Sequence, residues 1–118
     1  MRLSSSCILV GLLCAGAARA ESVALSCQIA SKEGPSQDLS VEIANGRVRY
    51  GSGGSALVEA QSISGFSMNG GSIAFRQNFP SERVVWDWTI DRASGAITIK
   101  YVNTANSSTF LTKRGTCR

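Results

Sequence analysis

The side chains best able to do chemistry in this sequence are a few carboxylates, because the chain contains no histidine. Histidine is the commonest general base and metal ligand, so most hydrolytic and metal-dependent mechanisms lack their usual residue. Asp87 and Asp91 lie four residues apart on one face of an alternating segment. Their backbones would be ~13 Å apart at ~3.3 Å per residue, wider than the ~5–9.5 Å between paired glycosidase carboxylates. We therefore expect no enzyme, and a carboxylate-dependent hydrolase is the weaker alternative.

Asp91 has a simpler predicted role. It precedes Ala93-Ser94-Gly95, a turn sequence in which an aspartate can accept hydrogen bonds from backbone N–H groups two residues on. Gly95 suits the left-handed position of a bulged hairpin loop. We expect Asp91 to cap this turn.

Two tryptophans form a second candidate site. Trp86 and Trp88 lie on one face of the same segment and could stack against a sugar ring. They share that face with Val84 and Ile90, which favours packing in the core. Gly51-Ser52-Gly53-Gly54 lacks the lysine and helix that follow a phosphate-binding loop, so it is expected to be a flexible turn. We expect no cofactor and no metal ion.

Basic residues offer a binding surface of another kind. Arg47 and Arg49 alternate with Val48 and Tyr50, so both should face outward, and with Lys100 they could bind an acidic partner. Such binding would weaken with salt, because exposed charges are screened over ~8 Å at physiological ionic strength. Lys113, Arg114 and Arg118 are expected to form a solvated tail. No nucleic-acid motif accompanies these charges.

The first twenty residues predict the compartment. Arg2 precedes an apolar stretch at 7–16, and Ala18-Arg19-Ala20 places small residues where a signal peptidase reads. The stretch is shorter than the ~20 residues that span a bilayer. We expect cleavage before Glu21, secretion into a bacterial periplasm, and one domain at 21–118 without a transmembrane segment. Losing Arg2 and Arg19 lowers the formal net charge from +4 to +2.

Two of the four cysteines remain after this cleavage. Cys7 and Cys14 lie in the signal peptide, whereas Cys27 and Cys117 lie near the two ends of the remaining chain. In an oxidising compartment these two are expected to form a disulfide. The loop-entropy model assigns ~4.5 kcal/mol to a loop of this length. Without a Cys-x-x-Cys pair, a redox role is not expected.

The remaining pattern is a series of short strands. Apolar residues alternate with polar ones, and turn sequences such as Asn45-Gly46 and Asn69-Gly70-Gly71 separate the alternating runs. Strands are expected at 23–29, 39–43, 48–50, 57–60, 83–91, 97–101 and 109–112. The region 62–79 is less regular, although Phe66 and Met68 can pair with Ile73 and Phe75.

This pattern predicts an all-β fold, a small antiparallel β-barrel or sandwich of seven to eight strands. The Cys27–Cys117 disulfide is expected to join the first strand to a residue just past the last, so that the two edges of the sheet meet. An eight-stranded barrel has an interior just wide enough for its own side chains. We therefore expect no roomy ligand cavity.

Two resemblances add to this interpretation. Ile90-Asp91-Arg92-Ala93-Ser94-Gly95 and Gly115-Thr116-Cys117 resemble features of small secreted β-barrel proteins of Gram-negative bacteria, which imply no particular activity. Ser62-Ile63-Ser64-Gly65, followed by Met68, Gly70 and Phe75, is similar in spacing to the inhibitory loop of periplasmic C-type lysozyme inhibitors. Arg76-Gln77-Asn78 departs from that family's second motif, so only Ser64 and Gly65 are carried over.

The expected function is therefore non-catalytic binding of a protein or an envelope polymer. The lysozyme-inhibitor alternative would act through the loop from Ser64 to Gly71, with Ser64 and Gly65 as contact residues. Ser-Gly in a β-rich secreted protein is otherwise an ordinary turn or β-bulge. The oligomeric state is left open.

Overall fold

The computed structural model describes residues 22–31 and 34–118, and the expected signal peptide with its cleavage site lies outside these residues. The described chain is all-β, as predicted, with a single 3-10 turn, η2 (Pro80–Glu82). The strands are β1 (Ser22–Ile29), β2 (Gln37–Ala44), β3 (Arg47–Ser52), β4 (Val58–Glu59), β5 (Ile63–Met68), β6 (Ser72–Phe79), β7 (Val84–Asp91), β8 (Ala96–Asn103) and β9 (Ser108–Cys117).

All nine strands belong to one antiparallel sheet in the order β4-β3-β2-β1-β9-β8-β7-β6-β5. This exceeds the seven or eight strands expected, because the irregular 62–79 region forms a full hairpin, β5 and β6. The strand expected at 57–60 is present as Val58–Glu59 and pairs with β3. The sheet is not closed, and its edges are β4 and β5. The expectation that β1 and β9 form the edges was wrong, because they lie side by side in the middle.

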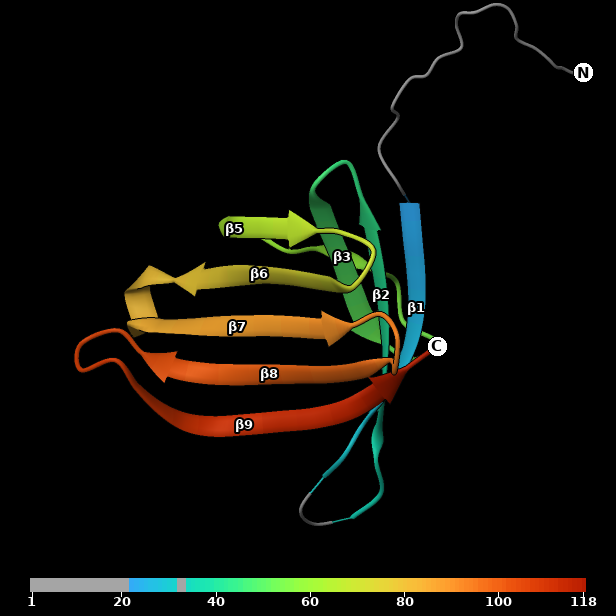
Figure 1. Cartoon of the computed structure of the whole chain (residues 1–118). Helices are drawn as coiled ribbons and strands as arrows, with labels where there is room; N and C mark the ends of the chain where they lie inside the picture. Colours follow the sequence, from blue (N-terminus) through green and yellow to red (C-terminus); the bar gives the residue numbers. More distant parts are fainter. Residues whose placement is uncertain (1–21, 32–33) are drawn as a thin grey trace, which may run out of the picture.

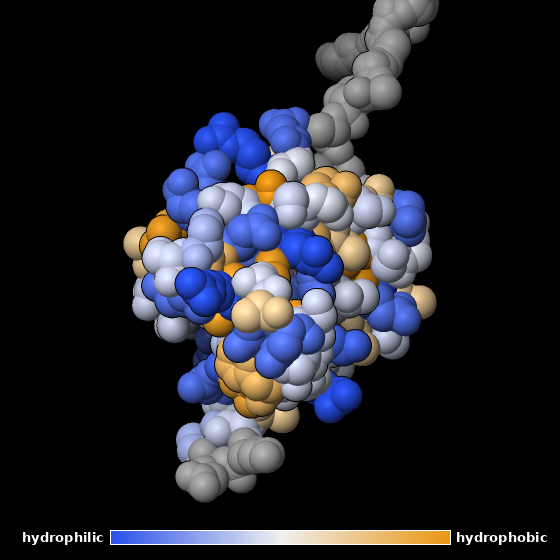
Figure 2. Space-filling view, turned by 90° about the vertical axis from the view of Figure 1, so that its left-hand side faces the viewer, coloured by the Kyte–Doolittle hydropathy of each residue, from blue (hydrophilic) through white to orange (hydrophobic). Residues whose placement is uncertain are grey.

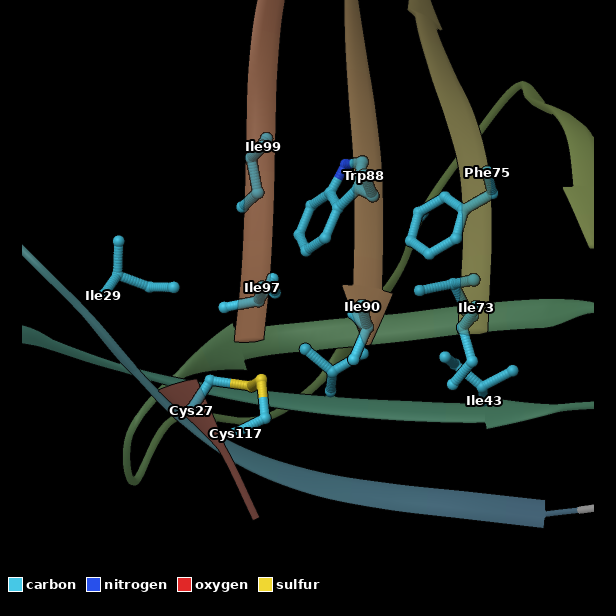
Figure 3. Packing of buried hydrophobic residues seen from close by; sticks show 13 residues of the cluster. Cys27, Ile29, Ile43, Ile73, Phe75, Trp88, Ile90, Ile97, Ile99 and Cys117 are labelled. Carbon is cyan, nitrogen blue, oxygen red and sulfur yellow. A yellow bond between two sulfur atoms is a disulfide. The ribbon is translucent and has the colours of Figure 1, made fainter. Parts of the chain in front are cut away.

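The sheet folds over itself at this central pair. Figure 1 shows β5 to β9 as one layer, with β1, β2 and β3 running across one end of it. We call β1–β4 the short half and β5–β9 the long half. The buried side chains lie where the two halves cross, as Figure 3 shows for Ile73, Ile90 and Ile97 above Ile43. The long half extends beyond this crossing.

The seam between β1 and β9 is narrow. Its ladder comprises the pairs Cys27–Cys117, Gln28–Thr116 and Ile29–Gly115. Backbone hydrogen bonds between Ser26 and Arg118, at 2.9 and 3.0 Å, and from Ala30 to Arg114, at 2.8 Å, flank it. The first pair of the ladder is the predicted disulfide, and both of its cysteines are buried. Cys117 is thus the last residue of β9 rather than a residue beyond it, and the disulfide lies at the junction of the two halves.

The predicted turns account for the local register. Asn45 and Gly46 both have positive φ, at 56° and 72°, as the tight turn between β2 and β3 requires. In the β5–β6 turn, Asn69 Oδ1 accepts hydrogen bonds from the N–H groups of Gly71 and Ser72 at 2.7 and 2.9 Å. Asp91 Oδ1 accepts from the N–H groups of Ala93 and Ser94 at 2.9 and 3.2 Å, confirming its capping role.

Candidate functional site

A cleft between the two halves of the sheet is lined by aromatic, aliphatic, acidic and basic side chains. Its volume is about 490 Å³, and it is an open cleft between the halves rather than a cavity inside a closed barrel. The expectation of no roomy cavity assumed a closed barrel, whereas the open sheet leaves space where the long half extends past the short one. The lining residues are Ile29, Gln37, Asp38, Leu39, Tyr50, Ser52 and Gly53 from the short half and Trp86, Trp88, Ile99, Tyr101 and Lys113 from the long half.

Aromatic rings dominate the floor of the cleft. Trp86 on β7 lies between Phe79 on β6 and Tyr101 on β8, with ring centroids 4.7 and 4.6 Å away. Trp88 contacts Phe75 at 5.2 Å and Tyr50, from the opposite half, at 5.5 Å. The tryptophan faces are therefore already occupied by protein rings. Core packing was the predicted role, and Trp88 is buried, but Trp86 is only half-buried and also lines the cleft.

A lysine ends one row of the core. In register across β6, β7, β8 and β9, the row runs Phe75, Trp88, Ile99 and Lys113. Figure 3 shows the first three side chains next to one another and pointing the same way. Lys113 Nζ lies 5.5 Å from the centroid of the Tyr101 ring. The prediction that Lys113 belongs to a solvated tail was wrong, because β9 extends to Cys117 and turns Lys113 toward the cleft.

Two buried polar atoms next to the floor lack hydrogen-bond partners within the described residues. They are Gln77 Oε1 and Trp88 Nε1. Gln77 Nε2 donates to Tyr50 Oη across the halves at 3.1 Å, and Tyr50 in turn stacks on Trp88. Buried polar atoms are normally paired, so unpaired ones concentrate where a protein does something besides packing.

The mouth of the cleft is polar. Asp38 Oδ1 accepts a hydrogen bond from Gln28 Nε2, and Gln28 Oε1 accepts one from Ser36 Oγ at 2.8 Å. Asp38 is exposed, in contrast to the half-buried Lys113. The cleft thus has one anionic side chain at its rim and one cationic side chain on its floor.

The end of the long half away from the crossing has a mixed surface. Figure 2 shows that end, with polar residues predominating and apolar areas separated from one another. Phe110 and Leu111 near the start of β9 are exposed, and Phe110 is the extra residue of a bulge in the β8–β9 pairing. No broad apolar face is visible in this view, which leaves the cleft as the stronger candidate.

Ser64 and Gly65 lie on the edge strand β5. The β5–β6 register shifts between Ser64 and Ser67, and Gly65 has a φ of +61°, so the ordinary bulge predicted for Ser-Gly is present. Asn78 Nδ2 donates to Ser64 Oγ at 3.1 Å. Both residues line a second hollow of about 460 Å³, on the outer face of the long half, together with Arg76, Asp87 and Lys100 among others.

Arg47 and Arg49 face outward as predicted, but both are paired. Arg47 donates two hydrogen bonds to the Glu59 carboxylate, at 2.9 and 2.8 Å, and Arg49 donates one to Glu42 at 2.8 Å. Lys100 lies on the outer face of the long half, opposite Asp87, and is not brought next to them. The expected arginine surface is therefore a row of exposed ion pairs rather than a concentration of positive charge.

The Arg47–Glu59 pair makes stability depend on pH. Hydrogen bonds from Arg47 hold the pKa of Glu59 below its ordinary value of 4.5. A lowered pKa contributes stability above the unfolded-state pKa, and that contribution is lost as pH falls through the folded-state value. An Arg47→Met variant should thus have a slightly lower melting temperature than the wild type at pH 7. The difference in melting temperature between the two proteins should disappear below pH 4.5 and in high salt. A difference that stays unchanged at acid pH would contradict this prediction.

Asp87 and Asp91, the two carboxylates considered from the sequence, each have a structural partner. Asp87 Oδ1 accepts a hydrogen bond from Arg76 Nε at 2.8 Å, and Asp91 caps its turn. Within residues 22–31 and 34–118, no group of three His, Cys, Asp or Glu side chains is placed to hold a metal ion. The described part of the chain also contains no helix with the length and apolar character needed to cross a membrane.

Comparison with known proteins finds no matching family model, no matching curated protein and no matching solved structure. The role of the cleft must therefore follow from its own chemistry. Of its residues, the sequence had pointed to Trp86 and Trp88. Tyr50, Tyr101 and Lys113 were not predicted as site residues, because their convergence depends on how the two halves cross. For these three residues the sequence carried one signal: Lys113 belongs to an alternating run of residues that ends at Cys117.

Proposed function

We propose that this protein is a non-catalytic binding module, secreted into a periplasm, and that the cleft between the two halves of its sheet is the binding site. The observation that carries the proposal is a cleft of about 490 Å³ whose floor combines aromatic rings with one lysine. A concave, mostly apolar site with a few polar groups is the usual form of a small-ligand site. We further propose that the sheet is a barrel that has not closed. The gap left between its two halves is the opening of the binding site.

The two tryptophans make this proposal testable. They are the only tryptophans in the chain, and both line the cleft. A proton–nitrogen correlation spectrum therefore carries two indole signals that report on the site. We would add N-acetylglucosamine, phenylalanine and dodecanol separately to the oxidised 21–118 chain. Saturable shifts of both indole signals support a cleft ligand; shifts confined to backbone amides of other surfaces, or none with any probe, would overturn the proposal.

A second candidate is partner binding through the loop from Ser64 to Gly71, as in the lysozyme inhibitors. The observation that favours it is the hollow beside Ser64 and Gly65, which lie on the accessible edge strand β5. Arg76 and Asp87, which form an ion pair, are part of the walls of this hollow. Such an arrangement suits a polar segment of a partner protein.

Substitution of Ser64 tests this second candidate. We expect a Ser64→Arg variant to lose inhibition of any C-type lysozyme that the wild type inhibits, because the longer charged side chain fills the hollow. Ser55→Arg is the matched control, since Ser55 is exposed in the β3–β4 connection, away from this hollow. Lysozyme turnover with and without each variant is the measurement. Equal inhibition by both variants, or none by the wild type, would rule out this loop.

A further inference from the structure

The cleft residues point to a particular class of ligand. We infer that the cleft binds a single-chain amphipathic carboxylate, with its alkyl chain along the aromatic and aliphatic floor and its carboxylate at Lys113. This inference rests on the proposed binding function and adds the ligand class.

Lys113 supplies the head-group contact. It occupies a position on the core face of the sheet, next to Ile99, where lysine is rare unless paired. Within the described residues the ion pairs formed are Arg47–Glu59, Arg49–Glu42 and Arg76–Asp87, so no carboxylate neutralises Lys113. The ammonium group of Lys113 lies over the ring of Tyr101. A ligand carboxylate there would gain a charge-assisted hydrogen bond in a partly desolvated site.

The rest of the floor favours an alkyl chain over a flat ring. A sugar or an aromatic ligand stacks on an exposed aromatic face. Tyr101 stacks on Trp86 and Phe79 contacts it at a tilt of 49°, while Phe75 and Tyr50 stack on Trp88. The floor therefore presents ring edges rather than free indole faces. Ile29, Leu39 and Ile99 add aliphatic surface, which a flexible chain can follow without a fixed plane.

The preferred charge of the ligand head group follows from how deeply Asp38 and Lys113 are buried. Asp38 is exposed at the rim and already accepts a hydrogen bond from Gln28. Lys113 is half-buried beside the apolar floor. Exposed charges are well screened by solvent, whereas partly buried ones interact more strongly. The site should thus prefer an anionic head group to a cationic one.

A comparison of head groups at constant chain length tests this inference. Tryptophan fluorescence of the oxidised 21–118 chain would be titrated with dodecanoate, dodecanol and dodecylamine, each below its micelle concentration. We expect dodecanoate to bind most tightly. A Lys113→Met variant keeps the apolar stem and removes the charge, so it should weaken dodecanoate binding by roughly tenfold or more and leave dodecanol unchanged.

Lys100→Met is the matched control, because Lys100 lies on the outer face and does not line the cleft. It should leave all three affinities unchanged. Equal binding of the three probes, or equal loss in both lysine variants, would overturn the head-group inference while the proposed binding function stands. Failure of all three alkyl probes, with indole shifts from N-acetylglucosamine or phenylalanine, would overturn the ligand class alone.

Discussion

Replacing both Cys27 and Cys117 with alanine is expected to lower the free energy of unfolding by ~4.5 kcal/mol. The disulfide closes nearly the whole described chain, because its cysteines are separated by 90 positions in the sequence. Removing it returns to the unfolded state the conformational freedom of a very long loop. A small domain has only ~5–15 kcal/mol of stability in total, so this loss takes a large share.

The position of the disulfide adds a second reason for a large effect. Among the described residues, the β1–β9 pairing is the one strand ladder that joins the two halves, and the disulfide links one of its residue pairs. Both cysteines belong to the buried cluster, so alanine also removes two apolar side-chain ends from the core. The seam should loosen first, and amide exchange at Gln28 and Cys117 should rise more than exchange in β7.

Urea unfolding of the oxidised wild type, the reduced wild type and the double variant measures this loss. The reduced wild type is the control, because it keeps both side chains and lacks only the bond. It should recover part of the core packing while still losing most of the stability. A loss below ~1 kcal/mol in both reduced protein and variant would show that the seam holds without the disulfide.

Local sequence features predicted much of this fold. Asn45-Gly46, Asn69-Gly70-Gly71 and Asp91 each fix a hairpin through contacts within a few residues, and all three turns form as expected. Alternation between apolar and polar residues then determines which face of each strand is buried. Both signals act over short distances along the chain, so they can be interpreted without knowing the tertiary arrangement.

Features that depend on long-range pairing were not predictable in the same way. Arg47 pairs with Glu59 only because β4 returns to the edge of β3. Lys113 faces the cleft because β9 pairs with β8 in unbroken register from Leu111 to Thr116, which places Lys113 opposite Ile99. A one-residue change in register would turn Lys113 to the other face. The composition and periodicity of the sequence do not specify the register of β9 against β8.

The cleft itself follows from the same long-range choice. A chain of this size was expected to close into a filled barrel, with β1 and β9 as the joined edges. The structure joins β1 and β9 in the middle instead and leaves β4 and β5 as edges. The short half then covers only part of the long half. Trp86 and Tyr101 stay half-buried beyond the crossing, and their exposed edges become the floor of a site.

Substitution of Gly115 with alanine is expected to destabilise the protein by ~3 kcal/mol, because the new methyl group has no room at the seam. A Cβ at this position would lie 2.1 Å from the carbonyl oxygen of Gln28 and 2.9 Å from the Cα of Ile29. Both neighbours are backbone atoms of β1, which a rotamer change cannot move. The β1–β9 seam would have to widen beside the disulfide, where β9 pairs with Ile29.

Gly70→Ala is the matched control for this prediction. No atom lies within 4 Å of a Cβ built on Gly70, which is exposed in the β5–β6 turn. The same substitution there should change the free energy of unfolding by less than ~0.5 kcal/mol. Urea unfolding of the two oxidised variants isolates the steric effect, because each adds one methyl group to a glycine. Equal stabilities would mean that β1 and β9 do not approach as closely as this seam requires.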